Sequence, residues 1–208
     1  MTKAIIFDMG GVLVDLDLKA CSDAFKQDLG FMKIDEILDA CHQKGIFSDL
    51  EQGLISADDF RSYVLANSRP GCTAADVDKA VWAILLGIAP EKADLLRRLS
   101  LTHDIYMLSN NNPIAIVRAR EIFEEAGIPM DSIFKKCYCS YQMKMLKPSR
   151  EFYDAVAEDI AIDRSGMLFI DDSLANVEAA LAAGIPSVHY RPGESLSSLV
   201  EKTLEGRC

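Results

Sequence analysis

Three short apolar runs of the sequence each end in side chains that can act as nucleophiles, hydrogen-bond donors or metal ligands. In chain order these side chains are Asp8, then Ser109 with Asn110, then the pair Asp171 and Asp172. A carboxylate can attack an electrophilic centre, and neighbouring carboxylates gather a hard divalent cation such as Mg²⁺. Lys147, in a loop ahead of the third run, adds a positive charge. Together these groups suit the binding and transfer of a phosphoryl group.

The segments that carry these residues are predicted to be strands of one parallel sheet. Residues 4–7, 105–108 and 167–170 are continuous apolar runs, typical of strands buried on both faces. Residues 136–140 and 187–190 predict two further strands, and apolar residues at helical spacing lie between the strands. The carboxyl ends of parallel strands meet at one edge of the sheet, so the polar groups can converge there. The sequence therefore predicts an α/β fold.

Residues 17–88 predict a helical module that follows the first strand. Their apolar residues recur at helical spacing, and capping patterns begin at Ser56 and Thr73. No convincing strand is expected here; residues 47–53 are expected to form a short turn, and His42 to lie on a helix surface. The predicted division of the chain is a core of residues 1–16 plus 89–208 and a helical cap of residues 17–88.

Composition and charge narrow the possible partners. The net charge of −10 argues against non-specific binding to nucleic acid or to an anionic membrane surface. No apolar run approaches the length of a membrane span, and the opening run is too short, and too soon interrupted by Asp8, for a signal peptide. The six cysteines lack the spacing of a zinc site. We therefore expect a reduced, cytoplasmic protein.

Four segments of the chain, taken in order, resemble the motifs of the haloacid dehalogenase superfamily of hydrolases. The segments are IIFDMGGVLVD, YMLSNNN, LKPSREFY and MLFIDDSLANVEAALAAG, and the resemblance covers nearly the whole chain. Each motif is weak alone, but four in order, each at a predicted strand end or helix entry, are specific. The resemblance implies a Rossmann-like core with a small, inserted all-helical cap.

The resemblance also implies roles for individual residues. It makes Asp8 the nucleophile that becomes an aspartyl-phosphate, with Lys147 linking the nucleophile to the phosphate. Ser109 and Asn110 are implied to bind the phosphate of the substrate. The implied cofactor is Mg²⁺. Its implied protein ligands are Asp8, the carbonyl of Gly10, Asp172 and, as an outer partner, Asp171.

One position departs from the pattern of the family. Most phosphatases of the superfamily carry an aspartate two residues after the nucleophile, where it acts as general acid and base; Gly10 stands there instead. A subset typified by a bacterial glucose-1-phosphate phosphatase resembles this chain in that glycine and in the cap stretch 51–56. General acid–base catalysis contributes about 10²–10⁴-fold. Rates should therefore depend steeply on the leaving group, unless Asp15 or a carboxylate of the cap replaces the missing acid.

Several polar residues outside the motifs have two interpretations. Asp15 and Asp17 are more simply explained as hydrogen-bonded carboxylates near the start of the cap than as acids. Glu51 either faces the substrate or belongs to a solvated cap surface. Asn176 either orients Asp172 or lies on an ordinary helix surface.

The sequence therefore predicts a Mg²⁺-dependent phosphatase that acts on a small phosphorylated metabolite, with a sugar phosphate preferred. One alternative is a metal-free 2-haloacid dehalogenase, in which the same aspartate attacks carbon. The adjacent carboxylates at 171 and 172 disfavour it, because without a cation they would repel each other. Another is a catalytically weak, phosphate-binding regulatory protein, although every phosphate and metal position is filled. No feature of the sequence predicts an oligomeric state.

Overall fold

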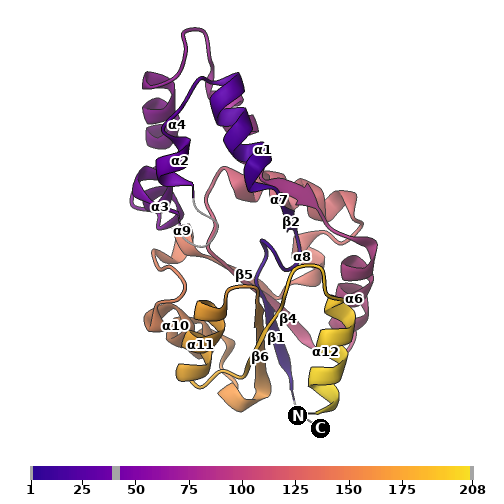
Figure 1. Cartoon of the computed structure of the whole chain (residues 1–208). Coiled ribbons are helices and arrows are strands. Elements are labelled where there is room, and N and C mark those ends of the chain that lie inside the picture. Colours follow the sequence, from indigo (N-terminus) through magenta and orange to yellow (C-terminus); the bar gives the residue numbers. More distant parts are fainter. Residues whose placement is uncertain (1, 39–42, 207–208) are drawn as a thin grey trace.

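A five-stranded parallel sheet forms the centre of the molecule (Figure 1). The structure is a computed structural model and describes residues 2–38 and 43–206. The strand order is β5-β4-β1-β6-β7, and each pair of neighbours is parallel. The strands are β1 (Ala4–Phe7), β4 (Asp104–Ser109), β5 (Lys136–Cys139), β6 (Met167–Asp171) and β7 (Ser187–His189). The predicted α/β fold with a parallel sheet is confirmed, and each predicted strand agrees to within one residue at either end.

Helices cover both faces of the sheet, which is why the central strands are continuous apolar runs. All of β1 is buried: Ile5 and Phe7 pack into a cluster with one set of helices, and Ala4 and Ile6 into a cluster with the other. The first set is α6 (Pro90–Ser100), α7 (Ala115–Glu125), α8 (Met130–Ile133) and α12 (Leu196–Glu205). The second set is α10 (Arg150–Ile160) and α11 (Leu174–Ala182).

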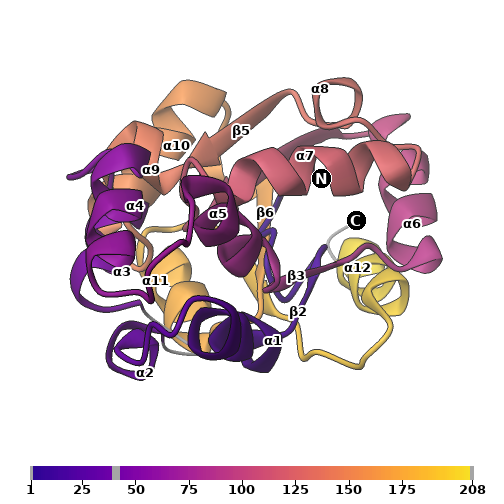
Figure 2. The same cartoon turned by 90° about the horizontal axis from the view of Figure 1, so that it is seen from above.

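A group of short helices lies beyond the carboxyl edge of the sheet (Figures 1 and 2). These elements are α1 (Leu18–Asp23), a π-helical turn (Ala24–Asp28), α2 (Ile34–Ile37), α3 (Gly45–Glu51), α4 (Ala57–Ala66) and α5 (Ala74–Trp82). Both predicted caps are confirmed. Ser56 with Asp59, and Thr73 with Asp76, form reciprocal capping boxes that satisfy backbone N–H groups at the starts of α4 and α5. The prediction for His42 falls outside the described residues.

Two local predictions for this region are wrong. Residues 17–88 do contain a strand, β3 (Leu85–Gly87), which pairs antiparallel with β2 (Asp15–Leu16). Strands this short leave no room for a period-two pattern in the sequence. The expected turn at 47–53 is largely helix α3. Gly45 is a poor helix former, but Phe47 and Leu50 bury one face of the helix, and this packing stabilises it.

The β2–β3 ribbon marks where the chain leaves the sheet and returns to it. Asp15 on β2 accepts a hydrogen bond from the ammonium of Lys92, 2.7 Å away on α6, and Lys92 is buried. The ribbon is therefore fastened to the sheet side of the molecule. Within the described residues, no helix is both long and apolar enough to cross a membrane.

Candidate active site

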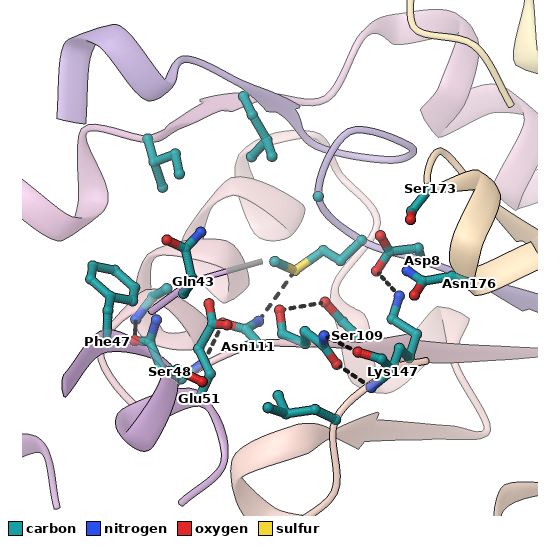
Figure 3. Close-up of a pocket in the computed structure, with 18 of the residues that line it drawn as sticks. Asp8, Gln43, Phe47, Ser48, Glu51, Ser109, Asn111, Lys147, Ser173 and Asn176 are labelled. Carbon is teal, nitrogen blue, oxygen red and sulfur yellow. Dashed lines mark hydrogen bonds and ion pairs between the residues drawn. The ribbon is translucent and has the colours of Figure 1, made fainter. Parts of the chain in front are cut away.

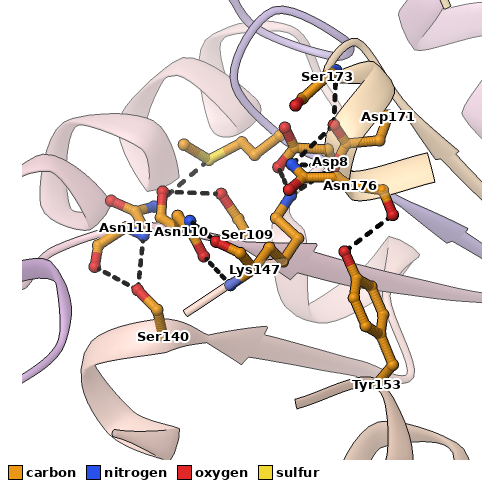
Figure 4. A network of polar contacts seen from close by, with 11 residues as sticks. Asp8, Ser109, Asn110, Asn111, Ser140, Lys147, Tyr153, Asp171, Ser173 and Asn176 are labelled. Atoms are coloured by element: carbon orange, nitrogen blue, oxygen red, sulfur yellow. Dashed lines mark hydrogen bonds and ion pairs between the residues drawn. The ribbon is translucent and has the colours of Figure 1, made fainter. Parts of the chain in front are cut away.

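Side chains from separate segments converge at the carboxyl edge of the sheet (Figure 4). Asp8 follows β1, Ser109 ends β4, and Asp171 ends β6. Lys147 enters from the loop between α9 (Ser140–Met143) and α10. Its Nζ lies 2.8 Å from Oδ1 of Asp8 and 2.7 Å from Oδ2 of Asp171. The sequence placed Asp8 and Asp171 at strand ends and Lys147 in a loop, and the structure brings both aspartates into direct contact with the lysine.

The charges of this cluster depend on one another. Burial raises the pKa of the Asp8 carboxyl to about 7; the ammonium of Lys147 opposes this shift, and the carboxylates of Asp171 and Asp172 add to it. Burial also works against the charge of Lys147, but Asp171 and Asp8 outweigh it and raise the pKa of the ammonium. Lys147 therefore stays positively charged and favours the nucleophilic, ionised form of Asp8.

Asp171 is fixed from several directions. Its side chain is fully buried and accepts hydrogen bonds from Nζ of Lys147, the backbone N–H of Ser173 (2.8 Å) and the side-chain amide of Asn176 (3.0 and 3.1 Å). Asn176 is buried and orients Asp171 rather than Asp172, which was the partner considered from the sequence. Both oxygens of Asp171 are thus occupied by donors, and its direct contact is with the lysine.

The residues at this edge fit a hard divalent cation. One carboxylate oxygen each from Asp8, Asp171 and Asp172 lies within 4.8 Å of the others. Asp172 is half-buried, and its carboxylate accepts no hydrogen bond from another described side chain, so it is the carboxylate most free to bind. Oδ1 of Asn176, at the same site, is buried without a hydrogen-bond partner among the described residues. An all-oxygen donor set of this kind is what Mg²⁺ prefers.

The turn after Asp8 uses its two glycines differently. Gly11 has φ +78°, and a Cβ there would lie 2.2 Å from Oδ2 of Asp172, so only glycine lets that carboxylate approach the turn. Gly10 is not in the left-handed region, and a Cβ there would meet only the side chain of Leu16, with 3.2 Å to the nearest atom. Position 10 therefore has no acidic side chain, although its backbone conformation is compatible with a side chain there.

The polar residues Ser109 and Asn110, at the end of β4, have different roles. Ser109 is buried and is one of the residues that line the cavity. The side-chain amide of Asn110 holds the backbone of Lys147 instead: its Oδ1 accepts from the Lys147 N–H at 2.8 Å, and its Nδ2 donates to the Lys147 carbonyl at 3.0 Å. Asn110 thereby sets the position of the lysine, and its carbonyl accepts a hydrogen bond from the Ser109 hydroxyl at 3.3 Å.

Sequence reasoning missed Ser140, which joins this edge to the helices above it. Ser140 is fully buried directly after β5. Its Oγ accepts a hydrogen bond from the backbone N–H of Asn111 at 2.9 Å and donates one to the carbonyl of Glu51 at 2.6 Å. The rule that selected Ser109, a polar residue at the end of a predicted strand, also applies to Ser140 and could have found it.

A cavity of about 520 Å³ lies over these groups, between the sheet edge and helices that include α3 and α5 (Figure 3). The core side includes Asp8, Ser109, Lys147 and Asp172. The residues from the other side are Gln43, Phe47, Ser48 and Glu51, with Val81, Ile84 and Leu85. Asp15 and Asp17 do not line it; Asp15 pairs with Lys92, and Asp17 caps α1 by accepting from the N–H of Ala20 at 2.9 Å. The hydrogen-bonded interpretation of both aspartates is confirmed.

The segment after α3 approaches the residues after β5 closely at Gly53. Gly53 has φ +68°, and a Cβ there would lie 2.2 Å from the carbonyl oxygen of Tyr141, so a side chain would force the two segments apart. We expect Gly53→Ala to lower kcat/KM by at least roughly tenfold, the equivalent of about 1.4 kcal/mol. Gly71→Ala is the matched control, because Gly71 also has positive φ (+93°) but no neighbour within 4 Å. Equal effects of the two substitutions on kcat/KM would show that backbone strain, and not the contact, is responsible.

The comparisons with known proteins agree with this geometry. The family of haloacid dehalogenase-like hydrolases matches residues 2–184. The chain therefore belongs to the haloacid dehalogenase-like hydrolase family. It is 34% identical over 194 residues to the D-ribitol-5-phosphate phosphatase of Bacteroides thetaiotaomicron, a match that covers 93% of this chain and 94% of that protein. It is 29% identical over 202 residues to a sesquiterpene phosphatase of Aspergillus oryzae, covering 96% and 94% respectively.

Solved structures extend the comparison. The crystal structure of a family member from Bacteroides thetaiotaomicron, in complex with magnesium and inorganic phosphate, matches with a TM-score of 0.88 and 35% identity. The match covers 96% of this chain and 99% of that one. The L-2-haloacid dehalogenase of Xanthobacter autotrophicus matches with a TM-score of 0.63 at 21% identity, covering 99% of this chain and 84% of that one. This second likeness shows a shared fold alone.

Proposed function

We propose that this protein is a Mg²⁺-dependent phosphatase that hydrolyses a small phosphorylated metabolite, with a sugar or sugar-alcohol phosphate as the preferred class. The observation that carries the proposal is the cluster of Asp8, Asp171 and Asp172 around the ammonium of Lys147, beneath a cavity. The relative that acts on D-ribitol 5-phosphate and the relative crystallised with magnesium and phosphate support it. A cavity of about 520 Å³ suits a metabolite of this size.

The residues present can divide the reaction between them. Asp8 attacks phosphorus in line with the bond to the leaving oxygen, and an aspartyl-phosphate forms on its carboxylate. Lys147, held by Asp171, carries positive charge toward the phosphoryl oxygens, and the Ser109 hydroxyl donates to them. Mg²⁺ bound by Asp8, Asp172 and the Gly10 carbonyl would supply further charge neutralisation. Water then attacks phosphorus, which releases phosphate and restores Asp8.

We further propose that residues 17–88 act as a cap over this site and that residues 1–16 plus 89–208 form the catalytic core. The β2–β3 ribbon lies at both junctions of this division. The cap side of the cavity is lined mainly by α3 and by the segment from α5 to β3. We therefore propose that these residues determine which organic group of a phosphate ester can bind. We place the reaction in the cytoplasm, as the sequence predicts.

A screen of phosphate release tests the proposal. We expect protein treated with a chelator to be inactive and added Mg²⁺ to restore turnover of an aryl phosphate and of some members of a panel of sugar and sugar-alcohol phosphates. Halide release from a 2-haloacid by metal-free protein would favour a dehalogenase instead. Binding of phosphate esters without turnover in the presence of Mg²⁺ would favour a regulatory protein.

A further inference from the structure

Position 10 has no acid, but the cavity contains one carboxyl group that the reaction described above does not use. Three carboxyl residues among the described part of the chain line the cavity: Asp8, Asp172 and Glu51. Asp8 and Asp172 belong to the nucleophile and cation positions. Glu51, the last residue of α3, lies on the cap side, opposite Asp8 and Lys147 (Figure 3).

The backbone of Glu51 is held against the core. Its carbonyl lies 2.6 Å from the hydroxyl of Ser140, which in turn accepts from the backbone of Asn111 beside the phosphate-binding segment. Two residues further on, Gly53 is packed against the carbonyl of Tyr141. The end of α3 is therefore held in place against Ser140 and Tyr141, two adjacent residues of α9.

The side chain of Glu51, by contrast, has no hydrogen-bond or ion-pair partner among the described residues. It is half-buried and lines the cavity. Burial raises its pKa to about 8; the negative charge of Asp8 adds to the shift and the positive charge of Lys147 opposes it. A carboxyl with this pKa carries a proton at neutral pH and can give it away.

The direction of attack places the leaving group on the side of Glu51. Because displacement at phosphorus is in line, the leaving oxygen departs on the face opposite Asp8, which is the face toward the cap. Water that later attacks the aspartyl-phosphate must approach from that same face. A group on the cap side can therefore serve both steps.

We propose that Glu51 is the general acid and base that replaces the missing carboxylate at position 10; the proposal rests on the phosphatase function given above. As the Asp8 oxygen bonds to phosphorus, the bond from phosphorus to the leaving oxygen breaks, and that oxygen takes the carboxyl proton of Glu51. The Glu51 carboxylate then accepts a proton from water while the water oxygen bonds to phosphorus and the bond from Asp8 to phosphorus breaks. The products are the alcohol and phosphate, and both carboxyl groups return to their starting states.

The test compares leaving groups of similar size, 4-nitrophenyl phosphate and benzyl phosphate, in the full-length protein with Mg²⁺. 4-Nitrophenolate is stable enough to leave as an anion, whereas the benzyl alkoxide must receive a proton as its bond to phosphorus breaks. We expect Glu51→Gln to lower kcat/KM for benzyl phosphate by about 100-fold or more, and for 4-nitrophenyl phosphate by only a few-fold. Because kcat/KM reports the steps up to release of the alcohol, a slower second step does not disturb this comparison. That slower step should instead appear as a burst of 4-nitrophenol followed by slow release of phosphate.

Asp49→Asn is the matched control, because Asp49 lies on the same helix and does not line the cavity. It should leave both kcat/KM values within twofold of wild type. Addition of Gly10→Asp to Glu51→Gln should recover part of the lost benzyl phosphate activity, since that backbone accepts a side chain. Equal losses on the two substrates, or no loss on either, would overturn the assignment of Glu51. If the wild-type protein turns over neither substrate, it is the phosphatase function that fails.

Discussion

Asp8→Asn abolishes turnover and leaves the fold intact. An amide has nearly the volume of a carboxylate but cannot attack phosphorus, so we expect kcat to fall by about 10⁴-fold or more. Lys147 keeps Asp171 as a partner at 2.7 Å, so the buried ammonium is not left unpaired. The measurement is phosphate release with Mg²⁺, together with thermal unfolding of both proteins.

A direct observation of the intermediate completes this prediction. Wild-type protein quenched in acid during turnover should yield a phosphorylated peptide that contains Asp8, and the variant should yield none. Substantial activity in a folded Asp8→Asn protein would rule out the covalent mechanism. An equally inactive protein that no longer unfolds cooperatively would instead assign the loss to folding.

Replacement of the adjacent carboxylates separates cation binding from structural support. Asp172→Ala should raise the Mg²⁺ concentration needed for half-maximal activity by at least about 10–100-fold. Loss of a residue that only supports a metal ligand already lowers metal affinity or activity by this factor, and Asp172 is proposed to bind the metal directly. Its unfolding temperature should change little, because the Asp172 carboxylate is half-buried and supports no other described side chain. The measurement is a Mg²⁺ titration of phosphate release.

Asp171→Asn is the comparison variant, and the structure predicts a different result for it. Asp171 accepts from Lys147, Ser173 and Asn176 in a fully buried position, and an asparagine there has only one accepting oxygen in place of two. Lys147 keeps Asp8 as a partner at 2.8 Å, so we expect the substitution to cost about 1–3 kcal/mol of the free energy of unfolding, the cost of a buried donor left without its acceptor. From the sequence we assigned Asp171 only an outer role at the metal. If both variants change the Mg²⁺ requirement equally and neither changes stability, the division of labour between the two carboxylates is wrong.

The sequence by itself determined the parallel sheet and the residues at its carboxyl edge. Buried strands such as β1 are apolar at every position, so a polar residue at their ends stands out, and Asp8, Ser109 and Asp171 were found in this way. Parallel pairing then requires these ends to lie on one edge. The capping boxes at Ser56 and Thr73 were equally visible, because their hydrogen bonds join residues three positions apart.

Only the tertiary structure decided what each of these polar groups does. The sequence could not show that the Asn110 side chain is occupied by the backbone of Lys147, that Asn176 supports Asp171, or that Gly11 rather than Gly10 is the glycine the turn requires. It also gave no sign of the β2–β3 ribbon, which pairs segments far apart in the chain. Such contacts depend on distances across the fold, and they leave no periodic trace in the residues that make them.

The position of Glu51 shows the same limit most clearly. From the sequence it could equally face the substrate or solvent, because a short helix such as α3 carries too few apolar residues to define which face is buried. The structure places it on the cavity because Ser140 lies against its carbonyl and Gly53 permits the close approach to Tyr141. Both contacts join the end of α3 to residues some 90 positions further along the chain, so the environment of the Glu51 carboxyl exists only once these two segments have packed together.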